Sequence, residues 1–429
     1  MHFNHLLGNT NQVTSTSRTP TPKRTNRGVK IEPFRGWRIA PAYIEALAAQ
    51  YATPWLQNGD HTHLTHIFNK WQSDGAIDQD MIPAIYVYEQ TGPHGTLHGI
   101  LASTHLDSEL LPHENVIPER VNALTNLMRN TRINLDPVLL GFTGDGRTAA
   151  CITRTTHERP VLEVHCRDGQ SHRLWRISDA VDQSDVIDEL SGRAAYIADG
   201  HHRYAAGLRL RSSMHAENRG PGPWDYLPAL FVDADHSPLI LKAIHRVVPF
   251  ADPRQVLDAA RTQFQVREIE GEITEWLTLL ELAASKGPAF ILVTPKNSYL
   301  VSDPATELLE TVLRGTPESV KNVHLTVLHS VLLEHLWQVP DHPDDIHYEH
   351  NSHEAVRRVR EEGGVAILTT PPTQQELAAA AMDRVCLPRK STSFGPKPHP
   401  GLIFRAFEDV SLSASDPAIA FADTTSKKG

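Results

Sequence analysis

The chain has 429 residues, a formal net charge of −10 and 40% hydrophobic residues. That length suits two or three domains with cores of their own and excludes a minimal peptide-binding module. The acidic balance argues against a nucleic-acid partner. No apolar run approaches the ~20 residues of a membrane helix, so we expect no membrane partner either.

Cysteine and histidine usage limits the cofactor chemistry. The three cysteines form no Cys-x-x-Cys pair, so neither a disulfide framework nor a thiolate zinc site is expected, and a reducing cytoplasm fits best. The 25 histidines invite a metal hypothesis, but no His-Glu pair extends into His-Glu-x-x-His. We therefore assign no metal ligands.

The predicted elements begin after a basic tail. Residues 1–30 contain no acidic residue and are rich in Ser, Thr, Lys and Arg, a composition typical of disorder. Short β-branched and aromatic runs between Gly and Pro turns then predict strands, whereas three- and four-residue apolar spacings predict helices. The elements expected up to residue 190 are a helix near 43–51, a hairpin with strands in 81–90 and 95–104, a helix within 113–131, strands in 137–142, 149–155 and 161–169, and a helix over 177–190.

The second half of the chain continues this mixture. A strand over 194–198, a tight turn and a helix over 201–214 follow one another directly, a layout typical of phosphate binding. The further elements expected are strands in 226–234, 238–248, 288–295 and 365–370, helices over 253–264 and 273–285, and a helix carrying Leu325, Leu328, Leu332 and Leu336. We therefore expect an α/β (α+β) fold. The expected divisions are an N-terminal α/β segment over 31–99, a phosphate-binding domain over 100–218, a C-terminal α/β domain over 219–410 and a disordered tail over 411–429.

The sequence Asp199-Gly200-His201-His202-Arg203 carries the strongest chemical signal. Glycine permits a sharp turn, the first helical turn exposes unpaired N–H groups to an anion, and the guanidinium suits phosphate oxygens. The two imidazoles offer proton transfer. Consecutive basic side chains at the positive end of a helix favour an anionic partner, although an Asp N-cap on a plain surface helix is the alternative.

Two further segments offer partners for this turn. His113 and Glu114 stand where we expect a helix to begin. The Glu114 carboxylate could accept a hydroxyl proton or hold Mg²⁺, and the alternative is an acid that is only favoured by the helix dipole. Lys390, Ser391 and Thr392 suit a phosphate or a carboxylate, although such a basic turn is more often only solvated. The Gly-rich loops of P-loop and Rossmann nucleotide sites are absent.

The segments YIADGHHRY, PHENV and LPRKSTSFGPKPHPGL resemble a bacterial family catalogued as a domain of unknown function, over residues 31–405. The middle stretch also resembles the ParB/sulfiredoxin superfamily, whose closest members in motif are free-serine kinases. This resemblance implies a ParB/sulfiredoxin-like mixed sheet, Glu114 as the catalytic acid, and Asp199 to Arg203 as the turn that holds nucleotide phosphates. Our hypothesis is that the nucleotide is ATP or ADP, with Mg²⁺ nearby. The chain departs from the family pattern at Ala52–Leu56, where Pro-Pro-Tyr-Asp-Val is usual, and at Ala123-Leu124, where Asp-Arg is usual.

These interpretations lead to one hypothesis with two alternatives. The hypothesis is phosphotransfer from a nucleotide to the hydroxyl of free serine or a related small amino acid. The residues expected to act are Glu114, His201 and His202 as catalytic groups, Asp199 to Arg203 as the nucleotide site, and His113, Lys390, Ser391 and Thr392 as substrate contacts. The first alternative is hydrolysis of phosphoserine or a similar phosphomonoester by the same residues. The second is a non-catalytic nucleotide-binding regulator, and the oligomeric state stays open.

Overall fold

The computed structural model describes residues 28–44, 46, 62–93, 95–237, 239–342 and 344–407. Nearly all of the two expected tails, most of the helix near 43–51 and the Ala52–Leu56 segment lie outside these residues. Val29 is fully buried, and its N–H donates to the carbonyl oxygens of Leu190 and Arg193. The described part mixes helices and strands throughout, so the α/β fold class is confirmed.

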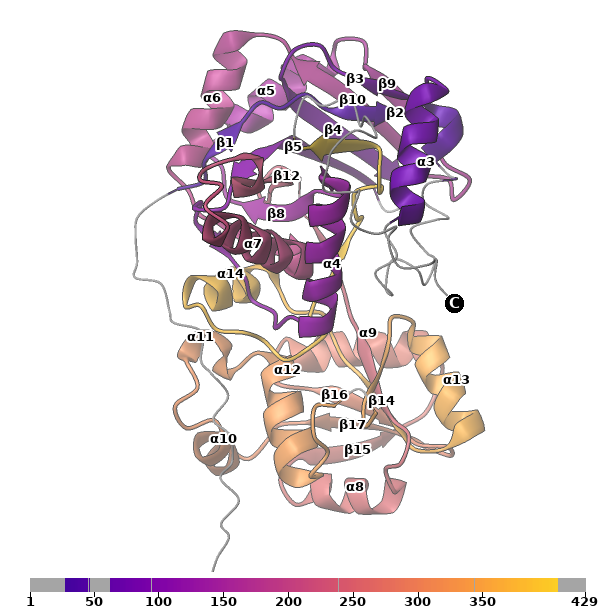
Figure 1. Cartoon of the computed structure of the whole chain (residues 1–429). Helices are drawn as coiled ribbons and strands as arrows, with labels where there is room; N and C mark the ends of the chain where they lie inside the picture. Colours follow the sequence, from indigo (N-terminus) through magenta and orange to yellow (C-terminus); the bar gives the residue numbers. More distant parts are fainter. Residues whose placement is uncertain are drawn as a thin grey trace, which may run out of the picture.

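A nine-stranded mixed sheet forms the upper body of the molecule (Figure 1). Its order is β6-β11-β8-β12-β5-β4-β10-β9, and β1 also pairs with β5. β6 with β11 and β8 with β12 are parallel pairs, and the other pairs are antiparallel. The strands are β1 (Ile31–Glu32), β4 (Ile85–Gly92), β5 (Gly95–His105), β6 (Leu110–Leu111), β8 (Val138–Phe142), β9 (Leu162–His165), β10 (Ser171–Ile177), β11 (Ala195–Asp199) and β12 (Tyr226–Asp233). The expected hairpin is confirmed as β4 and β5.

Four helices cover one face of this sheet and share a hydrophobic core with it. They are α4 (Pro118–Thr131), α5 (Arg147–Thr156), α6 (Ala180–Ser191) and α7 (His201–Ala216). The strand expected in 149–155 is wrong, because this segment belongs to α5. Its buried residues recur at helical spacing, and the Glu189 carboxylate accepts the N–H groups of Gly146 and Thr148 at 3.2 and 2.6 Å, which satisfies the helix start.

The opposite face packs against α3 (Thr62–Ser73) and a small four-stranded sheet. The strands of the small sheet are β3 (Ile77–Gln79), β2 (Trp37–Ile39), β21 (Ile403–Ala406) and β7 (Ile133–Asn134), in that order. β21 comes from the end of the described chain, so the C-terminal segment returns to the upper body. Trp37 of β2 stacks on Phe404 of β21 with ring centroids 6.2 Å apart, and this contact helps to hold the C-terminal segment against the upper body.

The lower body is a six-stranded antiparallel sheet with helices on both faces (Figure 1). In sheet order its strands are β15 (Gln265–Ile269), β17 (Ser298–Ser302), β16 (Phe290–Val293), β19 (Val365–Leu368), β14 (His245–Val248) and β18 (His347–Glu349). Helices α9 (Ile273–Ala284) and α13 (Ser352–Glu362) cover one face. On the other face, α8 (Pro253–Arg261) packs beside the helix expected around Leu328, most of which is a π-helix over Val327–Leu336.

The remaining elements are short. They are the 3-10 turn Pro223–Asp225, β13 (Ile240–Lys242), α10 (Thr306–Val312), α11 (Glu318–Lys321), α12 (His324–Thr326), α14 (Gln374–Met382) and β20 (Ser393–Gly395). β13 pairs with β20, so the outgoing and returning chains run side by side between the bodies. β12 lies inside the nine-stranded sheet although it follows residue 218. The division of the chain at residues 99, 218 and 410 stays a prediction.

Candidate functional site

The turn between β11 and α7 has the strand, turn and helix geometry expected from the sequence. β11 ends at Asp199, Gly200 is left-handed with φ of 98°, and α7 begins at His201. A Cβ atom on Gly200 would lie 3.0 Å from Nε of Arg203, so the turn favours glycine for both conformation and space. Because glycine supplies no capping side chain, the first N–H groups of α7 remain available to an anion.

Arg203 finds anionic partners within the chain itself. Its guanidinium forms an ion pair with Asp199, Nη1 donates to the carbonyl oxygen of Pro137 at 2.6 Å, and Nη1 lies 4.0 Å from Oδ2 of Asp136. Contrary to the expectation from the sequence, an external anion is not needed to balance this guanidinium. Burial raises the pKa of Asp199, but the charges of Arg203 and Lys397 outweigh burial, so the pKa ends below its ordinary value.

His201 and His202 are held by the loop that precedes α4. The backbone N–H of His113 donates to Nε2 of His201 at 3.4 Å, and that of Ile117 donates to Nε2 of His202 at 2.9 Å. Each ring therefore carries its proton on Nδ1. Burial lowers the pKa of His201 to about 3 and also lowers that of His202, so both imidazoles are neutral at pH 7. The two rings thus have a structural role in fixing the loop against α7.

Glu114 lies in this loop rather than at a helix start. β6 ends at Leu111, and α4 begins only at Pro118. Proline at the first helical position presets its own φ and holds Ile117 before it in extended backbone, with φ of −88° and ψ of 118°. The expectation of a helix beginning at His113 and Glu114 is therefore wrong, and the helix dipole does not account for the carboxylate.

His113 is fully buried beside the turn. Its ring meets that of His201 edge to face, with centroids 4.7 Å apart, and also lies 6.3 Å from the ring of Phe394 in β20. Burial lowers the pKa of His113 to about 4, so this ring is neutral as well. Among the described residues its Nδ1 has no hydrogen-bond partner, whereas Nε2 lies 3.4 Å from Oγ1 of Thr392.

The returning C-terminal segment brings two lysines to the turn. The backbone N–H of Lys390 donates to Oε1 of Glu114 at 3.4 Å, across 276 residues of sequence. Nζ of Lys397 lies 2.7 Å from Oδ1 of Asp199. Burial raises the pKa of Glu114 above its ordinary value, and Lys390 and Lys397 only partly counter this effect. The structure therefore brings together three segments that are far apart in the sequence.

The three expected substrate residues of this segment differ in what they offer. The Lys390 side chain is exposed and forms no ion pair with any described residue. Ser391 is buried, and its hydroxyl donates to the carbonyl oxygen of Pro388 at 2.6 Å, so it stabilises the turn. Thr392 is half-buried and faces the His113 ring. Of the three, Lys390 is best placed to meet a ligand.

Two residues near the site are not predicted from the sequence. Arg246 of β14 is fully buried, and its Nη2 donates to the carbonyl oxygens of Arg389 and Lys390 at 3.3 and 3.1 Å, so it fixes the lysine turn from below. Burial lowers its pKa to about 10, which leaves it charged at pH 7. Asp136 supplies an oxygen, Oδ1, that is buried without a hydrogen-bond partner among the described residues. The sequence does contain a signal for each residue. Arg246 is a charged residue inside an apolar strand pattern, and Asp136 is an acidic residue directly before Pro137.

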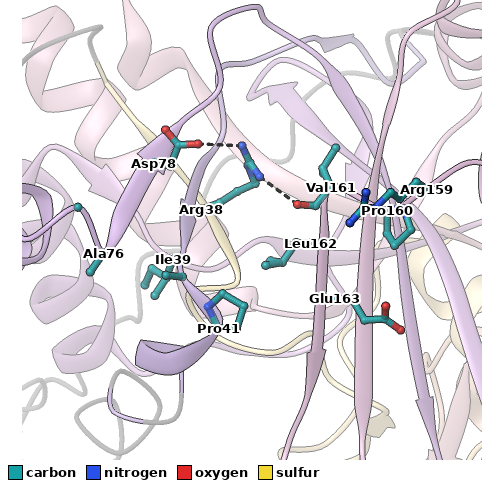
Figure 2. Close-up of a pocket in the computed structure, with 12 residues that line it drawn as sticks. Arg38, Ile39, Pro41, Ala76, Asp78, Arg159, Pro160, Val161, Leu162 and Glu163 are labelled. Carbon is teal, nitrogen blue, oxygen red and sulfur yellow. Dashed lines mark hydrogen bonds and ion pairs between the residues drawn. The ribbon is translucent and has the colours of Figure 1, made fainter.

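A cavity of about 390 Å³ lies elsewhere, between β2 and the start of β9. Figure 2 shows Arg38 within it, bound both to Asp78 and to the carbonyl oxygen of Val161. None of the site residues expected from the sequence lines this cavity. A smaller cleft of about 290 Å³ opens instead beside the Glu114 loop, where Asn115 and Pro388 contribute to its wall.

The described residues set limits on other kinds of site. No group of three or more His, Cys, Asp or Glu side chains within them is arranged to hold a metal ion. Nor does any helix in the described part of the chain have the length and apolar character needed to cross a membrane. The site is thus built from carboxylates, imidazoles and ammonium groups around one helix end.

The family described as "Protein of unknown function (DUF1015)" matches residues 54–321. The chain belongs to this family. The matched DUF1015 region includes Glu114 and the turn from Asp199 to Arg203 but stops before Lys390. A search of curated proteins finds no match.

Solved structures with detectable likeness share little sequence with the chain. A free serine kinase in complex with AMP has 16% identity and a TM-score of 0.37, over 70% of this chain and 90% of that one. A conserved hypothetical protein from Pyrococcus furiosus has 16% identity and a TM-score of 0.36, over 73% and 95%. SbnI with a C-terminal truncation, from Staphylococcus aureus, has 11% identity and a TM-score of 0.34, over 71% and 81%.

Proposed function

We propose that the protein is a nucleotide-dependent phosphotransferase that acts on the hydroxyl group of a small amino-acid-type acceptor. The observation that carries this proposal is the meeting of Glu114 with the lysine segment at the start of α7. Lys390 donates its backbone N–H to Glu114 at 3.4 Å, and Lys397 pairs with Asp199 at 2.7 Å. A carboxylate base, ammonium groups and a helix N-terminus are among the groups that support phosphoryl transfer, together with a metal ion.

The phosphates of ATP or ADP would lie against the turn at Gly200. The N–H groups at the start of α7, a helix of 16 residues, favour an anion there. The exposed ammonium of Lys390 has no ion-pair partner among the described residues and supplies the opposing charge. Lys397 supplies a second positive charge if a phosphate draws it from Asp199.

Glu114 would act as the general base. Burial raises its pKa toward neutrality, which makes its carboxylate a better proton acceptor than an exposed glutamate. The acceptor hydroxyl gives its proton to Glu114 while its oxygen bonds to the terminal phosphorus. The bond from this phosphorus to the bridging oxygen breaks, and the shortened nucleotide leaves with that electron pair.

Mg²⁺ would enter with the nucleotide, because this ion usually takes only one or two carboxylates from a protein. The Asp136 carboxylate fits such a role, since its buried Oδ1 has no hydrogen-bond partner among the described residues. Asp199 is the second oxygen ligand at hand, although Arg203 and Lys397 already engage it. When bound, the ion would neutralise charge on the transferring phosphoryl group.

The contacts of the imidazoles favour phosphotransfer over phosphoserine hydrolysis. A phosphatase that used these residues would need His201 or His202 to act as an acid or a nucleophile. His201 is 6% exposed, and its pKa of about 3 keeps it from acting as an acid near pH 7. Nε2 of His202 already accepts the N–H of Ile117. We therefore assign the two histidines to positioning and the proton transfer to Glu114.

The test is to incubate the purified protein with ATP or ADP, Mg²⁺ and L-serine, and to follow phosphoserine by ³¹P NMR. The sequence resemblance makes serine the first acceptor to try. Glu114→Gln should lower kcat by about 100-fold or more with nearly unchanged nucleotide affinity, since general bases contribute roughly 10² to 10⁴. Glu119→Gln, in the exposed first turn of α4, is the matched control and should keep full activity.

Two outcomes would overturn the proposal. Release of phosphate from phosphoserine without any nucleotide would establish the phosphatase alternative. Nucleotide binding without turnover, across a panel of hydroxyl amino acids, would establish a non-catalytic regulator.

A further inference from the structure

The cleft of about 290 Å³ beside the Glu114 loop lies between the two bodies. We call it the π-helix cleft, because Ser330, Leu333 and Glu334 of the π-helix line one wall. Asn115 and the segment 385–388 line the other wall. The π-helix is fixed by hydrogen bonds such as that from the N–H of Trp337 to the carbonyl oxygen of Leu332 at 3.0 Å. Such helices occur frequently at functional sites.

The π-helix cleft adjoins the loop that carries the proposed general base. Asn115 directly follows Glu114 in the same loop. The N–H of Leu387, another wall residue, donates to the carbonyl oxygen of His113 at 2.9 Å. The negative charge of Glu114 also helps to raise the pKa of the Cys386 thiol in the wall, after the larger effect of burial. The cleft therefore borders the loop that carries Glu114, although Glu114 itself is not one of the residues that line it.

The charges of the wall select against an anionic ligand. No Lys or Arg side chain lines the cleft, whereas Glu334 and Asp341 do. Asp341 is engaged by Arg389 and by the hydroxyl of Tyr348, each at 2.8 Å. Glu334 is exposed and forms no ion pair with any described residue. The unpaired carboxylate suits an ammonium group.

The remaining wall combines apolar side chains with polar ones, which are Asn115, Thr316, Thr326, His329, Ser330 and Cys386. Val320 and Leu333 are buried wall residues, and Val339 is half-buried. Nε2 of His329 accepts the Nε–H of Arg246 at 3.1 Å, so its proton lies on Nδ1, which bonds to no described residue. Burial lowers the pKa of His329 to about 3, which keeps the ring neutral. The wall thus offers apolar contact, a carboxylate and a neutral donor, a combination typical of ligand pockets.

We infer that the π-helix cleft binds the acceptor of the proposed phosphotransfer, and that this acceptor is a hydroxyl compound with an ammonium group and an apolar substituent. This inference rests on the proposed function. Free serine has no apolar group to cover the walls formed by Val320 and Leu333. A seryl dipeptide with a free N-terminus and an apolar second residue has every required group, so seryl-leucine is the probe.

Binding is measured by calorimetry without nucleotide, on the full chain. We expect seryl-leucine to bind at least ten-fold more tightly than L-serine and N-acetylseryl-leucine, because only the probe has both the ammonium group and the leucine side chain. Glu334→Gln should remove the preference over N-acetylseryl-leucine. Glu281→Gln on α9, also at an exposed position, is the matched control and should leave the preference for seryl-leucine over N-acetylseryl-leucine unchanged. Ser330→Phe, which fills the cleft, should abolish binding and leave nucleotide affinity intact.

The outcomes separate this inference from the proposed function. Equal binding of all three compounds, or binding unaffected by Ser330→Phe, overturns the inference even if the protein phosphorylates serine. If seryl-leucine binds in a way that depends on Glu334 but is never phosphorylated, the proposed function is overturned, and the cleft remains a binding site for amines. Glu114→Gln should keep the binding of seryl-leucine, which confirms that the measurement does not rely on turnover.

Discussion

Replacing His113 by phenylalanine tests whether this buried ring is neutral. Burial lowers the pKa of His113 from 6.5 to about 4. Between about pH 6.5 and pH 4, His113 is therefore protonated in the unfolded chain but neutral in the folded protein. The contribution of the neutral His113 ring to the free energy of unfolding is complete above pH 6.5 and is lost as the pH falls from 6.5 toward 4. Between pH 8 and pH 5 the loss amounts to roughly 2 kcal/mol for this one group.

The His113→Phe variant cannot take up that proton. Its ring would retain contacts with His201 and Phe394, and the change removes an Nδ1 atom that has no partner among the described residues. We expect the free energy of unfolding at pH 8 to change by no more than about 1 kcal/mol. Its decrease from pH 8 to pH 5, measured by urea denaturation, should be about 2 kcal/mol smaller than in the parent. His335→Gln, at an exposed position, controls for loss of any histidine. Equal pH slopes in parent and His113→Phe would refute the reasoning.

Two further predictions concern the groups that shape the site. Gly200→Ala should destabilise the protein by roughly 1–2 kcal/mol in urea denaturation, because φ is 98° and the new Cβ crowds Arg203, whereas Gly287→Ala meets no atom within 4 Å and should be nearly neutral. If Gly200→Ala left the free energy of unfolding unchanged, the left-handed turn would be contradicted. Arg246→Lys should cost roughly 2–4 kcal/mol, since a lysine cannot reproduce the fork that binds the carbonyl oxygens of Arg389 and Lys390. An effect below about 0.5 kcal/mol would show that this buried guanidinium does not hold the lysine turn.

The local elements that carry the turn could be predicted because their signals are local. The apolar run before Asp199 predicts a buried strand, and Gly200 predicts a left-handed turn, as the structure shows. The segment 149–155 is predicted as a strand because its β-branched residues favour one. The carboxylate that caps the true helix comes from Glu189, about 40 residues later, so no local pattern could reveal it.

The partners of Arg203 and Glu114 could not be predicted in the same way. A sequence shows that Arg203 is basic, but only the fold places Asp136 and the carbonyl oxygen of Pro137 beside it. The helix start at Pro118 was visible as a proline, yet the apolar spacing around it suggested an earlier start. Arg246 stands in a strand pattern where a charged side chain is unexpected, and its acceptors lie more than 140 residues away.

The sequence by itself determined the mixed α/β class, most of the elements and the sharp turn at Gly200, because hydrophobic periodicity and backbone preferences act over a few residues. Only the tertiary structure decided that Glu114, the turn and the lysines meet. That meeting depends on β20, which pairs with β13, and on β21, which returns the last described residues to the upper body. Strand pairing over such distances is selected by the burial of whole faces, and no short stretch of residues encodes it.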